Sequence, residues 1–331
     1  RGHDGGRQSL RKSRGQEGAG TGRLTVMKAL DLKRVRVLVN RKSGLFWSFD
    51  DVQRALDEHW GAPDRELVYQ FTHDVEDGRA KVARAVEQGV DLILVVGGDG
   101  TISSVGRALV DSDVCLGTIP TGSGNGLARH FEVPLAPGNA ARALAAGTVR
   151  RIDVGMTNAQ PFFITCSMAW DAALVRSFNR MPVRGILPYV FAGVYEFFEY
   201  RPQPIRLCVD EEETLEFDEP LVCTVANLSE YGGGAVVSPE AQPDDGLLDL
   251  VVARRQDVPM ILAHIGKMID GGISSLPKVV HRRFSTLTAS RPDAAPVQVD
   301  GELVESPAEL RIDVKPRAIN ILVPTPPDAG R

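Results

Sequence analysis

Gly97-Gly98-Asp99-Gly100-Thr101 and Pro120-Thr121-Gly122-Ser123-Gly124-Asn125-Gly126 are the two stretches that decide the fold of this 331-residue chain. Each follows an apolar run, at 91–96 and 114–119, with the composition of a buried strand. A glycine turn between a strand and a helix lets the backbone approach a bulky anion and presents the free N–H groups of the helix N-terminus. Two such turns on adjacent strands predict a phosphate-binding cradle and therefore a nucleotide-using enzyme.

Both turns lack the features of two other phosphate-binding loops. Neither fits Gly-x-Gly-x-x-Gly followed by an acidic residue about twenty positions on, which disfavours that kind of dinucleotide binding. Neither contains Gly-Lys-Ser or Gly-Lys-Thr, so neither is a Walker A loop.

The residues around the turns alternate between strand-like and helix-like patterns from residue 33 to about residue 118. The pattern predicts helices at 50–59 and 78–88 and a helical face formed by Ile102, Val105 and Leu109. Apolar runs separate these helices and predict strands at 34–39, 66–72, 91–96 and 114–119. Buried strands separated by helices are typical of a parallel sheet covered on both faces, with ligands at the carboxyl ends of the strands.

The chain after Arg150 has a different pattern, which predicts mainly antiparallel strands joined by short turns. The predicted strands are 162–169, 205–209, 221–227, 247–253, 284–289, 297–300, 310–314 and 319–323. Helix-like stretches interrupt them at 171–180, 187–200 and 258–269.

Composition narrows the class of protein. The formal charge is −5 with a pI near 5.8, although residues 1–26 are basic, so the remaining chain is acidic. An acidic body argues against nucleic acid as a partner. The four cysteines are widely spaced in apolar runs and are expected to be reduced core thiols of a cytoplasmic protein. No run approaches eighteen consecutive apolar residues, so none predicts a membrane span.

Residues 1–26 are rich in Gly, Arg, Ser and Gln and contain too few apolar residues to fold. They also lack the apolar core of a secretory signal. We interpret Met27 as the native start of the chain and the residues before it as an added tail. The alternative is a basic arm that contacts anionic lipid.

Four ordered motifs resemble those of the diacylglycerol kinase catalytic domain family, which includes sphingosine kinases, ceramide kinases and bacterial lipid kinases. The two glycine turns are the first pair, and the second turn continues as Leu127-Ala128-Arg129. The third motif is Asn-Leu-Ser-Glu-Tyr-Gly-Gly-Gly at 227–234, running on to Pro-Asp-Asp-Gly-Leu-Leu-Asp at 243–249. The fourth is Asp300-Gly301-Glu302. The resemblance covers about residues 33 to 325.

The resemblance implies a domain plan and an activity. It implies an N-terminal doubly wound α/β nucleotide-binding domain at 33–152 and a larger antiparallel β-sandwich domain at 153–317, and we expect residues 1–32 before them to form a disordered tail. The last strand, within 318–325, would return to the first domain, and ATP would bind in the cleft between the two domains. The implied enzyme is a lipid kinase that uses ATP and Mg²⁺ to phosphorylate a hydroxyl of diacylglycerol or a sphingoid-like lipid. It would be a cytoplasmic protein in transient contact with the inner face of the membrane. The resemblance is compatible with either a monomer or a homodimer.

The resemblance also implies the nucleotide site. The residues expected to contact the nucleotide are Gly98, Asp99, Gly100 and Thr101 of the first turn, Gly122 and Ser123 of the second, and the strand-end residues Asn40 and Thr72. Arg41 replaces the proline that usually follows this asparagine in the family. For Thr72, a strand-end threonine without a ligand is the alternative.

Two carboxylates compete for the role of general base. Glu302 matches the proton acceptor of the bacterial lipid kinases, and Asp99 matches the residue proposed as base in the sphingosine kinases. We favour Glu302 as the base and Asp99 as the organiser of phosphate and Mg²⁺. Considered alone, Asp-Gly-Glu is typical of an ordinary hairpin turn.

The segment 242–247 is a turn by its composition. In bacterial relatives the matching turn binds a structural Mg²⁺, which implies Asp245 with the carbonyls of Gln242 and Leu247 as ligands here. Oxygen ligands of this kind suit Mg²⁺, and a solvated β-turn is the alternative.

One departure from the family keeps other functions open. Ser103-Ser104 follow the first turn where the family usually has Asn-Glu, so a charged contact is missing. A non-catalytic nucleotide- or lipid-binding regulator is therefore one alternative. An NAD kinase-like enzyme, which shares Gly-Gly-Asp-Gly, is another, although the second and third motifs argue against it. The acceptor lipid is not specified, because the apolar stretch 184–198 fits an acyl-chain pocket, a bilayer contact or a core helix.

Overall fold

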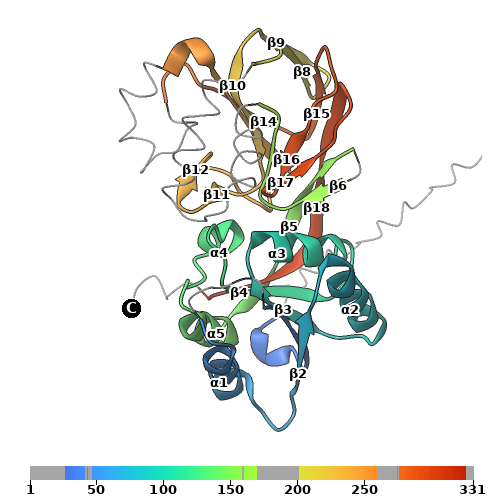
Figure 1. Ribbon diagram of the computed structural model, residues 1–331, viewed down its shortest axis with the longest axis vertical. Helices are drawn as coiled ribbons and strands as arrows, with labels where there is room; N and C mark the ends of the chain where they lie inside the picture. Colours follow the sequence, from blue (N-terminus) through green and yellow to red (C-terminus); the bar gives the residue numbers. More distant parts are fainter. Residues whose placement is uncertain are drawn as a thin grey trace, which may run out of the picture.

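The computed structural model describes residues 27–41, 43, 47–158, 160–169, 201–258, 274 and 276–325. Within these residues the chain forms two stacked units, shown in Figure 1 with the helical unit below and the strand-rich unit above. This arrangement confirms the predicted α/β domain followed by a β-sandwich domain.

The first unit is built on four parallel strands. Strands β1 (Arg34–Asn40), β2 (Glu66–Thr72), β3 (Leu92–Gly97) and β4 (Cys115–Pro120) pair in the order β2-β1-β3-β4. Every residue of β3 and β4 is buried, as expected for central strands of a covered sheet. The carboxyl ends of these strands therefore form one edge, where both glycine turns begin.

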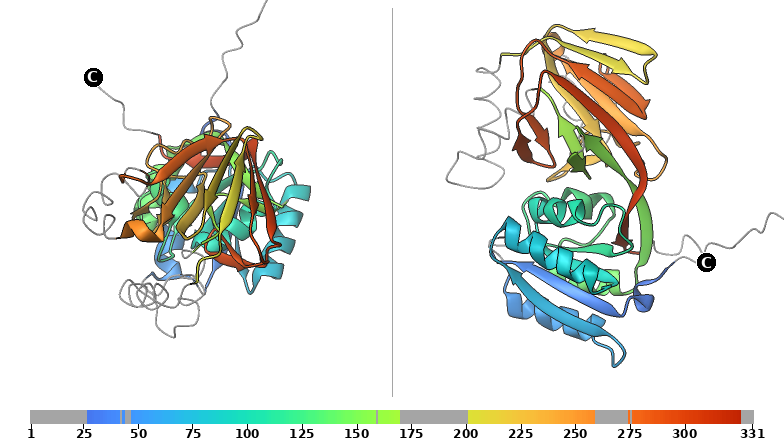
Figure 2. Two further views of the ribbon diagram at one scale, coloured as in Figure 1. Left: turned by 90° about the horizontal axis from the view of Figure 1, so that it is seen from above. Right: turned by 90° about the vertical axis from the view of Figure 1, so that its right-hand side faces the viewer.

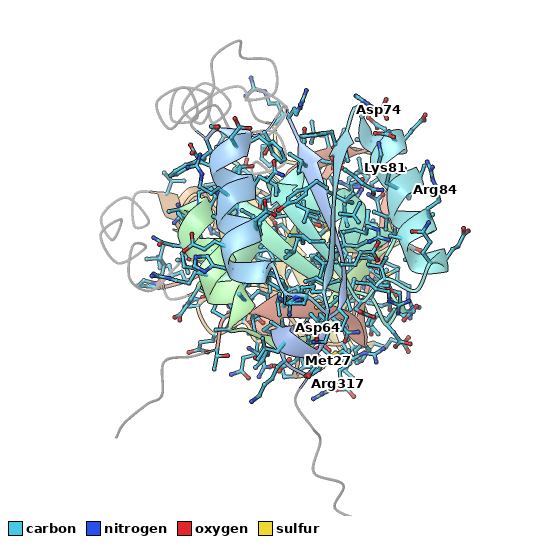
Figure 3. The ribbon with its side chains drawn as sticks, turned by 90° about the horizontal axis from the view of Figure 1, so that it is seen from below. Met27, Asp64, Asp74, Lys81, Arg84 and Arg317 are labelled. Atoms are coloured by element: carbon cyan, nitrogen blue, oxygen red, sulfur yellow. The ribbon has the colours of Figure 1, made fainter. Side chains whose placement is uncertain are left out.

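Helices cover both faces of this sheet. Helix α1 (Phe49–Trp60) packs beside α5 (Pro137–Ala145), whereas α2 (Val75–Glu87) packs beside α3 (Asp99–Arg107) on the opposite face. Figure 3 shows α1 and α2 on opposite sides of the strands, with Asp74 and Lys81 marking α2. The α2 helix begins after Asp74, whose carboxylate accepts a hydrogen bond from the Asp77 N–H at 2.8 Å. A further short helix, α4 (Gly126–His130), follows the second glycine turn.

The second unit is a sandwich of two antiparallel sheets. The six-stranded sheet has the order β14-β13-β10-β7-β16-β17, and the facing layer contains β9-β8-β15 and one end of β18. Aromatic and aliphatic side chains between these layers, among them Phe162, Leu250 and Phe284, form a core separate from that of the first unit. The strands are β7 (Thr165–Ser167), β8 (Ile205–Val209), β9 (Glu213–Phe217), β10 (Pro220–Ala226), β13 (Leu248–Arg254), β14 (Val280–Phe284), β15 (Thr286–Ser290), β16 (Val297–Val299), β17 (Glu302–Val304) and β18 (Glu309–Val323).

Two long strands join the units. Strand β18 pairs with β15 at its start and runs parallel to β4 at its end, where Asn320 lies opposite Cys115. Strand β5 (Thr148–Thr157) pairs with β18 along most of its length and with the short β6 (Gln160–Phe162). Figure 2 shows β5 and β18 passing together from one unit to the other. Because one sheet is continuous through both units, the geometry between them is set by backbone hydrogen bonds.

Two predicted strands are wrong in extent, each because a carboxylate binds the backbone. The predicted strand 162–169 is interrupted after β6, where Asp300 accepts hydrogen bonds from the N–H groups of Phe163 and Ile164. The predicted strand 284–289 is two strands in different sheets. They separate at Ser285, whose N–H donates to Asp210 at 2.9 Å. Conversely, 310–314 and 319–323 form the single strand β18, with a register shift between Lys315 and Ile319.

The predicted tail ends too late. Residues 27–32 are packed, because Ala29 is fully buried and the Met27 carbonyl accepts a hydrogen bond from the Val149 N–H at 2.8 Å. A short 3-10 helix, η1 (Ala29–Asp31), precedes β1. The helices predicted at 171–180 and 187–200, most of the helix predicted at 258–269, and residues 1–26 lie outside the described residues.

Candidate active site

The first glycine turn forms the start of α3. Gly98 is the N-cap of this nine-residue helix, and Asp99, Gly100 and Thr101 form its first turn. The Thr101 hydroxyl accepts a hydrogen bond from the Asn40 side-chain N–H₂ at 2.8 Å. The first N–H groups of a helix have no acceptor within the helix, so this end of α3 presents donors and a positive dipole.

The second glycine turn lies directly against the first. A Cβ atom on Gly122 would lie only 2.6 Å from the Gly98 Cα, so the two backbones approach at a distance that only glycine permits. Asn125 adopts a left-handed conformation with a φ of 54° and closes the turn through its side chain. Its carbonyl oxygen accepts from the Gly122 N–H at 3.0 Å, and its amide donates to the Gly122 carbonyl at 2.8 Å. Ser123 is exposed at the tip of the turn.

Asp99 connects the two turns. Its carboxylate accepts a hydrogen bond from the Gly126 N–H, at the start of α4, at 2.8 Å. Burial raises the pKa of Asp99, and the nearby Asp300 charge raises it further, against backbone hydrogen bonds that favour the ionised form. Asp99 is thus directed at the protein backbone of the second turn.

Thr72 and Asn40 lie side by side at the ends of β2 and β1, where they are register partners. The Thr72 hydroxyl donates to the Val39 carbonyl at 3.3 Å, and Thr72 lines a cavity of about 430 Å³ with Arg41, Phe71 and His73. The Arg41 guanidinium lies over the Phe71 ring, 4.1 Å from its centroid. The structure therefore brings Thr72, Asn40 and Thr101 into one row along the carboxyl edge of the sheet.

The Asp300-Gly301-Glu302 turn comes from the second unit. Asp300 is buried, and its carboxylate accepts hydrogen bonds from the N–H groups of Phe163 at 3.0 Å and Ile164 at 2.8 Å. It also accepts from the Ser103 hydroxyl of α3 at 2.8 Å. Burial raises the pKa of Asp300, whereas these donors and the Arg107 charge lower it. The turn is thus fixed at once on the segment between β6 and β7 and on α3.

Glu302 lies over the first turn of α3. One carboxylate oxygen is 3.7 Å from the place that a Cβ on Gly100 would occupy. The other oxygen pairs with the Arg107 guanidinium at 3.4 Å, and 46% of the side chain is exposed. Of the two candidate bases, Asp99 is engaged by the second turn, whereas Glu302 is accessible and lies above the first.

The segment that carries the third motif covers the second turn. The hairpin of β11 (Glu230–Gly232) and β12 (Ala235–Val236) packs on α4, and the Gly233 N–H donates to the Gly124 carbonyl at 2.8 Å. Beside it, Ser229 makes a 2.9 Å hydrogen bond with Nδ1 of His130. Figure 1 shows β11 and β12 next to α4 at the junction of the units.

The 242–247 turn is held by charged residues on each side. One Asp245 carboxylate oxygen accepts from the Leu247 N–H at 3.0 Å, and the other pairs with the Arg283 guanidinium. The buried Asp153 anchors the turn, because it accepts from the Gly246 N–H at 2.7 Å. The carboxylate of Asp245 and the carbonyls of Gln242 and Leu247 are oxygen donors that suit Mg²⁺, and the Arg283 guanidinium pairs with one oxygen of that carboxylate. The described residues contain no group of three or more His, Cys, Asp or Glu side chains arranged to hold a metal.

Several contacts at this site were not predicted from the sequence. Thr121 makes a 2.6 Å hydrogen bond with Ser43, and Arg107 meets Glu302. Ser103, which departs from the family pattern, is the link between α3 and Asp300. The helical spacing of Gly100, Ser103 and Arg107 was the available signal, since these positions share one face of α3.

Comparisons with known proteins agree with both units. Residues 34–157 match the diacylglycerol kinase catalytic domain, and residues 165–323 match the YegS C-terminal NAD kinase beta sandwich-like domain. A diacylglycerol kinase of Mycobacterium tuberculosis is 32% identical over 258 residues, covering 76% of this chain and 82% of the relative. A probable YegS-like lipid kinase of Pseudomonas aeruginosa is 30% identical over 266 residues, covering 78% and 85%.

Solved structures share the fold. A putative diacylglycerol kinase from Bacillus anthracis superposes with a TM-score of 0.74 at 21% identity, over 89% of this chain and 98% of that one. Among the described helices, none is long and apolar enough to cross a membrane. The two domain matches, in the same order as the two units, and the curated relatives together show that this chain belongs to the diacylglycerol kinase catalytic domain family of lipid kinases.

Proposed function

We propose that this protein transfers the γ-phosphoryl group of ATP to a hydroxyl group of a membrane-derived lipid, either diacylglycerol or a sphingoid-like base. The observation that carries the proposal is the position of Glu302, a carboxylate from the second unit that lies over the helix N-terminus of the first glycine turn. A phosphate group at that N-terminus and a hydroxyl at that carboxylate would be neighbours.

The two turns have the features that phosphoryl transfer needs from a protein, namely positioning and charge stabilisation. In this proposal the N–H groups at the start of α3 and the Thr101 hydroxyl would bind the phosphates, with Gly122 and Ser123 on the other side. Asp99 keeps the second turn against the first through Gly126. Thr72 and Asn40 continue this row and would contact the remainder of the nucleotide.

In the proposed reaction Glu302 takes the proton of the acceptor hydroxyl as its oxygen forms a bond to the γ-phosphorus. The bond from that phosphorus to the bridging oxygen breaks, and ADP leaves with the electron pair. Mg²⁺ bound to ATP would neutralise charge on the phosphates during transfer. We expect the lipid to reach the site from a membrane surface, so we also propose transient membrane contact.

The test is transfer of label from [γ-³²P]ATP by the full chain to vesicles of one composition that contain diacylglycerol, sphingosine or neither. We expect a labelled lipid phosphate, identified by chromatography, with one acceptor and none without it. In a parallel reaction with NAD added, label in NAD would instead indicate an NAD kinase-like enzyme. Binding of ATP without transfer to any acceptor, including a total lipid extract, would indicate a regulator and contradict the proposal.

A further inference from the structure

We propose that Arg107 is a positioning residue for Glu302, which it holds over the first turn of α3 in the orientation needed to accept the hydroxyl proton. This role rests on the proposed function of Glu302 as the base. Arg107 is the last residue of α3, and its guanidinium Nη1 lies 3.4 Å from Glu302 Oε2.

The contact is part of a helix face that fits the Asp300-Gly301-Glu302 turn. Gly100, Ser103 and Arg107 are spaced by three and four residues, so they lie along one side of α3. One Glu302 carboxylate oxygen lies 3.7 Å from the place that a Cβ on Gly100 would occupy, and Ser103 donates to Asp300 at 2.8 Å. The Ser103 contact fixes the start of the turn, and the Arg107 contact fixes the direction of the Glu302 side chain after it.

The environment of Arg107 argues against a purely structural ion pair. Only 14% of the Arg107 side chain is exposed, and its Nε and Nη2 atoms are buried without a hydrogen-bond partner among the described residues. Buried N–H donors left unpaired are costly. A pair with a half-exposed carboxylate contributes little to stability in return. A guanidinium held at this cost beside a proposed catalytic carboxylate indicates a functional role.

The charges around the turn support the same role. Asp300 and Glu302 are two carboxylates on one turn, and the Asp99 charge is near enough to influence Asp300. Arg107 is a cation at this group, pairing with Glu302 and lowering the pKa of Asp300 against the effect of burial. Without it, Glu302 loses the ion pair that directs its carboxylate toward α3.

The test compares Arg107→Met, Arg107→Lys, Glu302→Gln and the double variant Arg107→Met with Glu302→Gln. We expect Arg107→Met to lower kcat by about 10²-fold, a loss that a small misplacement of a catalytic group can cause, with the ATP dissociation constant unchanged. Arg107→Lys should recover most of the rate, because an ammonium group can still pair with Glu302. In the Glu302→Gln background the loss of Arg107 should have little further effect, since residues that act as a unit are not additive.

Arg84→Met is the matched control, because Arg84 lies in the last turn of α2 and hydrogen-bonds within its own helix. A normal kcat in Arg107→Met overturns the inference, as does an equal loss of rate with and without Glu302. If Arg107→Met does not fold, Arg107→Lys provides the test. The inference is then overturned if the kcat of Arg107→Lys is as low as the kcat of Glu302→Gln. If the wild type transfers no label to lipid, the proposed function is overturned and this role of Arg107 with it. The wild-type assay alone distinguishes that outcome from the others.

Discussion

Asp99 shows at the scale of one residue how this site is organised. Its carboxylate accepts the Gly126 N–H, so a charge in the first turn fixes the backbone of the second. Burial raises its pKa, which means that the ionised form is held at some cost in stability. The Gly126 hydrogen bond and its neighbours offset part of that cost.

We therefore expect Asp99→Asn to lose both ATP affinity and rate while the protein stays folded. The amide removes the charge that holds Gly126, and it also relieves the burial of a carboxylate, so the melting temperature should change little. Calorimetric titration with a non-hydrolysable ATP analogue measures the affinity. Asp113→Asn is the control, because Asp113 is exposed just before β4. Normal affinity in Asp99→Asn would mean that the carboxylate does not organise the turn.

For single residues, the sequence predicted which side chains are candidates for the site better than it predicted their contacts. It predicted Asp99, Thr101 and Gly122 from the glycine turns, which are local features. Glu302 was predicted from the family resemblance, because Asp-Gly-Glu alone is typical of an ordinary hairpin turn. The sequence did not predict that Ser103 binds Asp300, because that contact joins residues almost 200 positions apart. The proposed roles of the predicted site residues stay predictions until the variants are measured.

The packing of the two glycine turns is the decisive feature among the elements. A side chain on Gly122 would meet the Gly98 backbone at 2.6 Å, so the turns would have to separate. We expect Gly122→Val to weaken binding of the ATP analogue much more than it lowers thermal stability. Gly138→Ala, in α5 with its nearest neighbour at 3.8 Å, is the control and should bind normally. Unchanged affinity in Gly122→Val would assign the second turn a capping role only.

The 242–247 turn gives a second prediction for an element. Arg283 pairs with Asp245, so it competes with Mg²⁺ for the same carboxylate. We expect Arg283→Met to increase stabilisation by Mg²⁺ without nucleotide, by about 1.4 kcal/mol when the ion is at ten times its dissociation constant. Asp245→Asn should abolish this gain. Equal melting temperatures with and without Mg²⁺ in Arg283→Met would mean that the turn binds no structural ion.

The sequence predicted most elements because their signals are periodic and local. Strands β1 to β4 and helices α1 and α2 follow from apolar periodicity, within a few residues at each end. The breaks at Phe163 and Ser285 could not be predicted, since each depends on a distant carboxylate, Asp300 or Asp210. Apolar periodicity indicates where a strand is favoured. It does not indicate where a buried carboxylate accepts hydrogen bonds from backbone N–H groups and so interrupts that strand.

In the whole molecule, the junction of the units contains a histidine whose protonation opposes folding. Burial, with a smaller effect of the Arg150 charge, lowers the pKa of His130 from 6.5 to about 4, and Nδ1 accepts from the Ser229 N–H at 3.2 Å. A histidine with a lowered pKa contributes stability above its unfolded value of 6.5, and this stability is lost as the pH falls toward 4.

We therefore expect the wild type to lose about 2 kcal/mol of unfolding free energy from His130 alone between pH 7.5 and pH 5. His130→Gln should lack that part of the pH dependence. Denaturant unfolding of both proteins at the two pH values measures the difference. Burial raises the pKa values of Asp99 and Asp300, so these two groups increase the unfolding free energy as the pH falls, opposite to His130. Both groups are present in the wild type and in His130→Gln, so their effect cancels in the comparison. Equal pH dependence would contradict the buried, neutral state of His130.

The two-unit architecture explains why the candidate active site was only partly predictable. The sequence and its family resemblance predicted an α/β domain and a sandwich, but not one sheet continuous through both. Strands β5 and β18 provide that continuity, and β18 follows β17 and so fixes the Asp300-Gly301-Glu302 turn relative to α3. The position of Glu302 is thus a property of the whole fold.

The central claim is that Glu302, brought over the first glycine turn by the second unit, takes the proton of the acceptor. The most direct measurement is single-turnover transfer of label from [γ-³²P]ATP to lipid by wild type, Glu302→Gln and Asp99→Asn, with the ATP dissociation constant of each. Glu305→Gln, an exposed glutamate three positions along, is the control. We predict near-normal ATP affinity for Glu302→Gln with transfer slowed by about 10²–10⁴-fold, as expected for loss of a general base, and loss of both properties in Asp99→Asn. Wild-type transfer by Glu302→Gln, together with an Asp99→Asn protein that loses rate alone, would contradict the account and assign the base to Asp99.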